Sequence, residues 1–131
     1  MAINVLVVDD SEVVRSMIVK TVRLTGIELG QVHEASNGAD ALAVLETNWI
    51  DLVFVDINMP VMNGEEMIRR VRANVAWADL PMIIVSTEGS QTRIESLLDD
   101  NARFIHKPFT PEQIRDVANE MLGICHERTQ A

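Results

Sequence analysis

Short apolar runs alternate with segments of helical periodicity along most of the chain. Apolar or mixed segments of strand length predict five strands, over residues 3–9, 31–35, 51–56, 81–86 and 103–106. Segments with apolar side chains three or four positions apart predict five helices, over residues 12–25, 38–46, 64–73, 91–99 and 111–122. This alternation of strand and helix predicts an α/β fold, in which helices cover both faces of a parallel sheet.

The hydrophobicity of the predicted strands indicates their order in the sheet. The strands over 3–9, 51–56 and 81–86 are apolar almost throughout, as expected for strands that are buried on both faces. The strands over 31–35 and 103–106 are mixed in polarity and are expected at the edges. Numbered along the chain, the strands then take the order 2-1-3-4-5, which is the doubly wound, flavodoxin-like arrangement.

Capping residues mark the start of two helices. Ser11 precedes the first helix and is suited to cap it, and Gly26 is expected to end that helix. Thr110 and Gln113 flank Pro111 and Glu112 at the start of the last helix, in the pattern of a capping box with proline at the first helical position.

Length, charge and cysteine content narrow the class of protein. The 131 residues fit one domain, and no apolar run is long enough to span a bilayer. The N-terminus lacks a basic signal-peptide region, and the one cysteine, Cys125, has no internal disulfide partner, which favours a cytoplasmic protein. A net charge of −9 argues against nucleic acid or anionic membrane as a partner. We expect a monomer.

Chemically reactive residues follow four of the five predicted strands. Asp9 and Asp10 lie at the end of the first strand, Asp56 at the end of the third, Ser86 at the end of the fourth and Lys107 just after the fifth. Because ligands of open α/β sheets bind beyond the carboxyl ends of the strands, these side chains are expected to form one site. Three crowded carboxylates disfavour one another's ionisation, and a divalent cation such as Mg²⁺, with Mn²⁺ as a substitute, relieves this conflict.

The same residues suit phosphoryl chemistry. One aspartate could attack a phosphoryl group as nucleophile, while the cation and Lys107 neutralise the phosphoryl oxygens and Ser86 donates a hydrogen bond to one of them. Taken singly, the Asp9-Asp10 pair, Asp56 and Ser86 are better explained as helix caps, but their joint placement favours a site. The three histidines, His33, His106 and His126, share no spacing typical of a zinc site.

Four motifs carry a family resemblance over nearly the full length of the chain. They read VVDD at 7–10, VFVDINMPVMNG at 53–64, IIVST at 83–87 and HKPF at 106–109. In this order and spacing the chain resembles response-regulator receiver domains, of the CheY-like single-domain type. The resemblance implies a domain over residues 1–124, followed by a short C-terminal tail over 125–131.

The resemblance also implies a role for each site residue. Asp56 is implied to be the phosphoacceptor, with Mg²⁺ held by Asp10, Asp56 and the backbone carbonyl of Asn58, and with Asp9 assisting. Lys107 is implied to contact the phosphoryl oxygens, and the Lys107–Pro108 bond matches a cis peptide of the family.

Four further residues are implied to govern the signal and its lifetime. Ser86 is implied to be the switching hydroxyl, and Phe104 the aromatic residue that turns inward when the hydroxyl moves. Asn58 and Glu88 flank the path of the attacking water, as in chemotaxis regulators, which implies a phosphoryl lifetime of seconds to minutes.

The chain departs from the family pattern at three places. The chemotaxis regulators usually have Tyr where this chain has Phe104, so the hydroxyl available to a partner is absent. Thr87 replaces a smaller residue beside the switching hydroxyl and restricts rotation of the aromatic ring. Asn101-Ala102 replaces a Gly-Ala turn, and Asn tolerates the left-handed conformation that such a turn needs.

The leading hypothesis is a phosphoacceptor switch of a two-component system that catalyses only its own phosphorylation and autodephosphorylation. A sensor histidine kinase is the implied phosphodonor. The surface formed by the fourth helix, the fifth strand and the fifth helix is implied to bind an output protein, such as a flagellar-motor component or a phosphatase. Chemotaxis is the expected setting, because of the length of the chain and the Asn58 and Glu88 pair. A phosphate sink, or a phosphorelay receiver cut from a longer regulator, remains an alternative.

Two other classes fit less well. A haloacid dehalogenase-type phosphatase also forms an aspartyl-phosphate, but it requires an Asp-x-Asp pair and a cap domain, whereas Asp9 and Asp10 are adjacent. A nucleotide- or flavin-binding module is disfavoured because no glycine-rich loop follows the first strand.

Overall fold

The computed structural model describes residues 2–130, and of residues 126–130 it describes the backbone only. Five parallel strands form one sheet, namely β1 (Ile3–Val8), β2 (Leu29–Ala35), β3 (Leu52–Val55), β4 (Met82–Ser86) and β5 (Ala102–His106). Five helices follow the strands, namely α1 (Glu12–Arg23), α2 (Gly38–Thr47), α3 (Gly64–Ala73), α4 (Gln91–Leu97) and α5 (Pro111–Gln130). The strand order is β2-β1-β3-β4-β5, which confirms the predicted α/β flavodoxin-like fold and its two edge strands.

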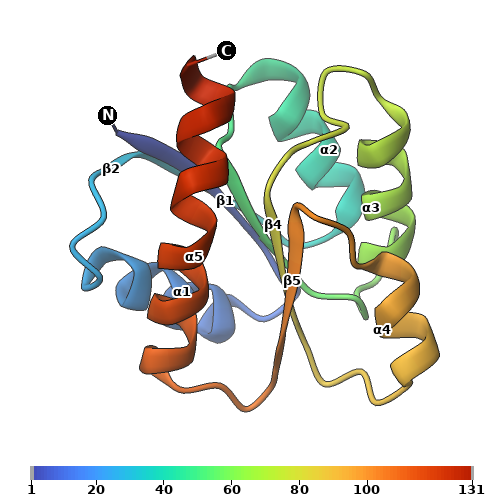
Figure 1. Ribbon diagram of the computed structural model, residues 1–131. Helices are drawn as coiled ribbons and strands as arrows, with labels where there is room; N and C mark the ends of the chain where they lie inside the picture. Colours follow the sequence, from blue (N-terminus) through green and yellow to red (C-terminus); the bar gives the residue numbers. More distant parts are fainter. Residues whose placement is uncertain (1, 131) are drawn as a thin grey trace.

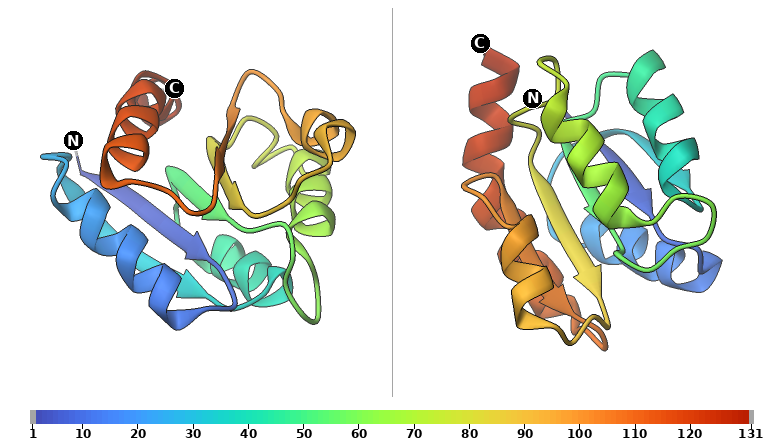
Figure 2. Two further views of the ribbon diagram at one scale, coloured as in Figure 1. Left: turned by 90° about the horizontal axis from the view of Figure 1, so that it is seen from below. Right: turned by 90° about the vertical axis from the view of Figure 1, so that its right-hand side faces the viewer.

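The sheet lies between two layers of helices, with α1 and α5 on one face and α2, α3 and α4 on the other (Figures 1 and 2). Alternation along the strands divides the core in two, because successive strand side chains point to opposite faces. Val5 and Val7 of β1 pack with α1 and α5, while Leu6 and Val8 pack with α2 and α3. The central strands are apolar almost throughout because both of their faces are buried.

The predicted helix starts are confirmed. The Ser11 side chain accepts a hydrogen bond from the Val14 amide at 3.2 Å. At the start of α5 the capping box forms in both directions. The Thr110 hydroxyl accepts from the Gln113 amide at 3.2 Å, and the Gln113 side chain accepts from the Thr110 amide at 2.8 Å. These caps fix where α1 and α5 leave the loops that carry the site.

Most element bounds differ from the prediction by one or two residues, and α5 differs most. It runs to Gln130, eight positions beyond the predicted end, and Gly123 does not interrupt it. Cys125 lies in this added length with its side chain fully buried, and its thiol donates to the Asp51 carbonyl oxygen at 3.3 Å. The division of the chain at residue 124 stays a prediction, although the helix is continuous across it. Within residues 2–130 no helix has the length and hydrophobicity to cross a membrane.

Candidate functional site

The register of the central strands places Asp9 beside Asp56. Val8 of β1 pairs with Val55 of β3, so the next residue of each strand is an aspartate. The Asp56 amide donates to the Val8 carbonyl oxygen at 3.0 Å, which keeps the two chains together just past the strands. The site therefore lies at the carboxyl edge of the sheet, where the sequence predicts it.

The neighbouring strand pair delivers Ser86 and Lys107 to the same edge. Ser86 pairs with His106 at the end of β4 and β5, and the Lys107 amide donates to the Ser86 carbonyl oxygen at 2.9 Å. The peptide bond between Lys107 and Pro108 is cis, as the family resemblance implies.

Lys107 joins the two buried aspartates. Its Nζ lies 2.7 Å from Asp9 Oδ2 and 3.0 Å from Asp56 Oδ2. Asp9 is 1% exposed and Asp56 is 7% exposed. One cation is thus shared by two carboxylates that have little contact with water, which makes these contacts stronger than ion pairs at the surface.

Burial and pairing shift the protonation of this group in defined directions. Burial raises the pKa of Asp9, and the hydrogen bonds from Lys107 and from the Ser11 amide oppose that rise in part. Burial alone lowers the pKa of Lys107, but its contacts with Asp9 and Asp56 outweigh burial and raise its pKa above the usual value. Lys107 is therefore a cation at neutral pH.

Asp9, Asp10 and Asp56 each offer a carboxylate oxygen, and these oxygens lie within 4.8 Å of one another. Asp10 is exposed to solvent, so a hydrated ion could reach the cluster from its side. An all-oxygen set with a solvent-facing carboxylate suits Mg²⁺, which keeps several of its waters and takes one or two carboxylates. The three acids that the sequence singled out as metal ligands are thus brought together.

A glycine holds the loop after β3 against the site. A Cβ atom added to Gly64 would lie 1.9 Å from the Asp56 carbonyl oxygen, so no larger residue fits there without movement. The Gly64 amide donates to the Ile57 carbonyl oxygen at 2.7 Å, and the Asn58 amide lies 3.4 Å from Asp56 Oδ1. This close approach sets the position of the loop that carries Asn58.

The two proposed switch residues lie on neighbouring strands. Ser86 is fully buried, and its hydroxyl oxygen accepts from the Glu88 amide at 3.2 Å. Phe104 is half-buried, and its ring meets the His106 ring edge-on, with 4.6 Å between centroids and 71° between planes. Thr87 is exposed.

Two arginines belong to the site and were missed by sequence reasoning. Arg15 donates to the Asp9 carbonyl oxygen at 2.6 Å and pairs with Glu34. Arg93 pairs with Glu88 and also donates to the Asn58 side chain. For Arg93 a signal existed, because a cation in the first turn of a helix opposes the helix dipole and needs compensating acceptors.

The histidines lie apart from the carboxylate cluster. His33 lies on edge strand β2 and bonds Gln31, while His106 is exposed on edge strand β5. His126 is among the residues whose side chains the structure does not describe. The described residues thus offer no histidine to the cluster.

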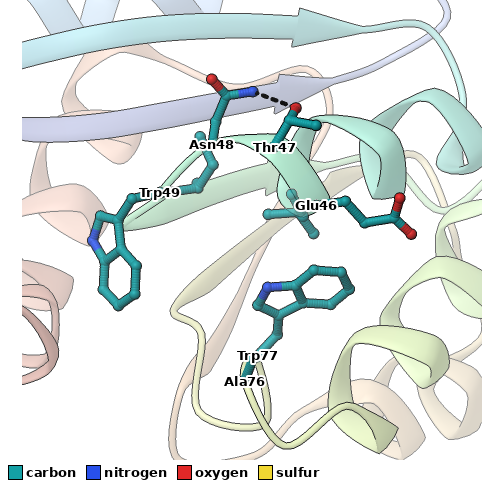
Figure 3. A pocket seen from close by; sticks show the side chains of 8 residues that line it. Glu46, Thr47, Asn48, Trp49, Ala76 and Trp77 are labelled. Atoms are coloured by element: carbon teal, nitrogen blue, oxygen red, sulfur yellow. Dashed lines mark hydrogen bonds between the residues drawn. The ribbon is translucent and has the colours of Figure 1, made fainter.

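An open cleft of about 330 Å³ lies at the opposite edge of the sheet, before β3 and β4. Trp49 and Trp77 line it from two different loops (Figure 3). Among its lining residues only Glu46 carries a carboxylate, so the cleft lacks the paired charged groups found at the other edge.

Comparison with known proteins agrees with this geometry. Residues 5–119 match the family model of the response regulator receiver domain. A chemotaxis protein CheY homolog of Campylobacter jejuni is 37% identical over 122 residues, which cover 92% of each chain. The chemotaxis protein CheY1 of Helicobacter pylori is 35% identical, over 92% of this chain and 97% of its own. The solved chemotaxis response regulator CheY4 of Vibrio cholerae superposes with a TM-score of 0.79 at 30% identity, over 92% of this chain and 99% of its own.

Proposed function

This chain belongs to the family of response regulator receiver domains, as its motifs predict, and on that premise we propose that Asp56 is its phosphoacceptor. The phosphodonor is a phosphohistidine of a sensor histidine kinase. The observation that carries the proposal is the contact of Lys107 with the buried Asp56 carboxylate, beside two further carboxylates.

Transfer requires one bond to form and one to break. An Asp56 carboxylate oxygen attacks phosphorus, the phosphorus–nitrogen bond of the donor breaks, and the leaving imidazole nitrogen keeps the electron pair and takes up a proton. Lys107 stabilises the negative charge of the phosphoryl oxygens with its ammonium group. Asp10, Asp56 and the Asn58 carbonyl, with help from Asp9, would hold Mg²⁺ or Mn²⁺, which would supply further charge neutralisation.

Ser86 and Phe104 convert this event into a change of surface. Phosphorylation adds charge and acceptor oxygens, which attract the Ser86 hydroxyl away from the Glu88 amide. The space that Ser86 leaves lets Phe104 turn further inward, and the surface of α4, β5 and α5 changes. That surface binds the output partner.

The named relatives support a chemotaxis setting, in which the partner is a flagellar-motor component or a phosphatase. We place the protein in the cytoplasm as a monomer, with a domain over residues 1–124. A phosphate sink or phosphorelay receiver uses the same chemistry and differs only in its partner.

The side chains of Asn58 and Glu88 set the lifetime of the phosphoryl group. Asn58 borders Asp56 through its amide, and Glu88 follows the switching hydroxyl by two residues. We expect them to direct or admit the attacking water, with a lifetime of seconds to minutes.

Stoichiometry and lifetime distinguish a switch from a phosphatase. After labelling with acetyl phosphate and Mg²⁺, we expect at most one phosphoryl group per chain, lost within seconds to minutes once the donor is removed. Many turnovers of p-nitrophenyl phosphate would indicate an enzyme instead, and a label that persists for many hours would contradict the predicted lifetime.

A further inference from the structure

Arg93 of α4 contacts three side chains, two of which come from the loops that follow β3 and β4. Its Nη1 lies 2.5 Å from Glu88 Oε1 and 3.3 Å from Asn58 Oδ1, and its Nε lies 3.3 Å from Glu65 Oε2. These partners come from the loop after β4, the loop after β3 and the first turn of α3. Arg93 therefore connects two loops of the site to two helices.

The side chains of Arg93 and its two acidic partners are only partly exposed to water. The side chain of Arg93 is 29% exposed, that of Glu88 14% and that of Glu65 21%. Partial burial reduces solvent and salt screening, so these contacts restrict the side chains more than ion pairs on the open surface do. A second contact fixes Glu88, because its Oε2 accepts from the Ser90 amide at 3.0 Å.

Two of the three partners are the residues assigned to the phosphoryl lifetime. Asn58 and Glu88 lie 30 positions apart in sequence, yet both meet the same guanidinium. A planar guanidinium can serve several acceptors in fixed directions, whereas a lysine ammonium acts as a compact point charge. The shape of Arg93 is thus suited to holding these two side chains in one arrangement.

We propose that Arg93 is a positioning residue for loss of the phosphoryl group from Asp56, acting by holding Asn58 and Glu88 beside the acceptor. The inference rests on the proposed function and adds a residue to it. Water attacks phosphorus, the phosphorus–oxygen bond to Asp56 breaks, the aspartate oxygen keeps the electron pair, and inorganic phosphate leaves with the protons of the water. Arg93 fixes the side chains that border this water.

The test is the decay rate of labelled protein after removal of acetyl phosphate. In Arg93→Ala we expect decay to slow by about threefold to tenfold, since misplaced groups lose much of their effect on a reaction. The decay rate of Arg93→Lys is expected to lie between those of the wild type and Arg93→Ala, because lysine restores the charge without the planar guanidinium. The control is Arg69→Ala, which removes another partner of Glu65 on the exposed side of α3 and is expected to leave decay unchanged.

A double-mutant cycle separates positioning from a merely structural role. Arg93→Ala is expected to change the decay rate less in a Glu88→Ala background than in the wild type, because one of its partners is already absent. Unchanged or faster decay in Arg93→Ala, or an equal effect in both backgrounds, would overturn the inference. If the wild type does not label at all, the proposed function itself fails.

Discussion

Lys107 carries an unusual share of the electrostatics of this molecule, since the chain contains only two lysines and this one is shared by Asp9 and Asp56. Its pKa is raised in the folded protein, so the stabilisation it provides is complete below its ordinary pKa of 10.5. That stabilisation is lost only as the pH rises through the folded-state pKa, and it is intact at neutral pH.

Loss of the Lys107 cation should slow phosphorylation of the protein strongly. For Lys107→Met we expect labelling of the protein by acetyl phosphate to slow by about 100-fold, comparable to removal of one oxyanion donor. The matched control is Lys20→Met, which removes the other, exposed lysine from α1 and should label at the wild-type rate. Equal rates for the two variants would argue against contact of Lys107 with the phosphoryl group.

When no metal is present, the buried carboxylate of Asp9 should lower the free energy of unfolding at neutral pH. Burial raises its pKa above the ordinary 3.8, so the native state holds this proton more tightly than the unfolded chain. The free energy of unfolding therefore falls as the pH rises from 3.8 through the folded-state pKa of Asp9. Above that pKa the destabilisation by the ionised carboxylate is complete. In buffer with a chelator at pH 7, Asp9→Asn should raise the free energy of unfolding, because it removes a buried charge while Lys107 keeps Asp56 as a partner.

Urea unfolding of the wild type and Asp9→Asn over a series of pH values checks the direction of this stability difference. The advantage of Asp9→Asn should shrink as the pH is lowered toward 3.8, because Asp9 then becomes neutral in the wild type as well. A variant that is less stable at pH 7, or whose advantage grows in acid, would contradict this account.

At the scale of elements, the sequence predicts most where the signal is local. The bounds of α3 agree with the prediction, because Asn63 caps the helix and Gly64 begins it. The order of the strands follows from their polarity, since a buried strand and an edge strand differ along their own length. The residues at the strand ends could be assigned to one site because the carboxyl ends of parallel strands lie along the same edge of the sheet.

Long-range contacts explain what the sequence does not predict. The last turns of α5 include Cys125, whose thiol donates to the carbonyl oxygen of Asp51, 74 positions away, and such a contact leaves no local pattern in the sequence. The contacts of Arg93 with Asn58 and Glu65 span 35 and 28 positions. Such pairs depend on how the loops meet in space, so helical spacing alone could not reveal them.

The buried position of Cys125 makes the length of α5 testable. Its thiol should react very slowly with a disulfide reagent in native buffer and at once in urea. Cys125→Ala should lower the free energy of unfolding by about 1 kcal/mol, because it leaves a small cavity in the core between α5 and the sheet. Rapid reaction of the native thiol would show that α5 separates from the sheet near its end.

At the scale of the whole molecule, the parallel strands bring the candidate site residues together at one edge of the sheet. Parallel strands bring residues far apart in sequence, from Asp9 to Lys107, within hydrogen-bond distance at that edge. The two helical layers keep the strands dry, so the charges at their ends are partly buried. The fold thus places a shared lysine and three carboxylates where a phosphoryl group and a cation could both be bound.

Locating the phosphoryl group on the chain tests the central claim most directly. The wild type, Asp56→Asn and the exposed-site control Asp116→Asn are treated with acetyl phosphate, with Mg²⁺ or with a chelator, and the label is mapped by mass spectrometry of peptides. We predict a Mg²⁺-dependent label on Asp56 in the wild type and in Asp116→Asn, and none in a folded Asp56→Asn. A label of ordinary extent in Asp56→Asn, or one on another residue of the wild type, would contradict the account.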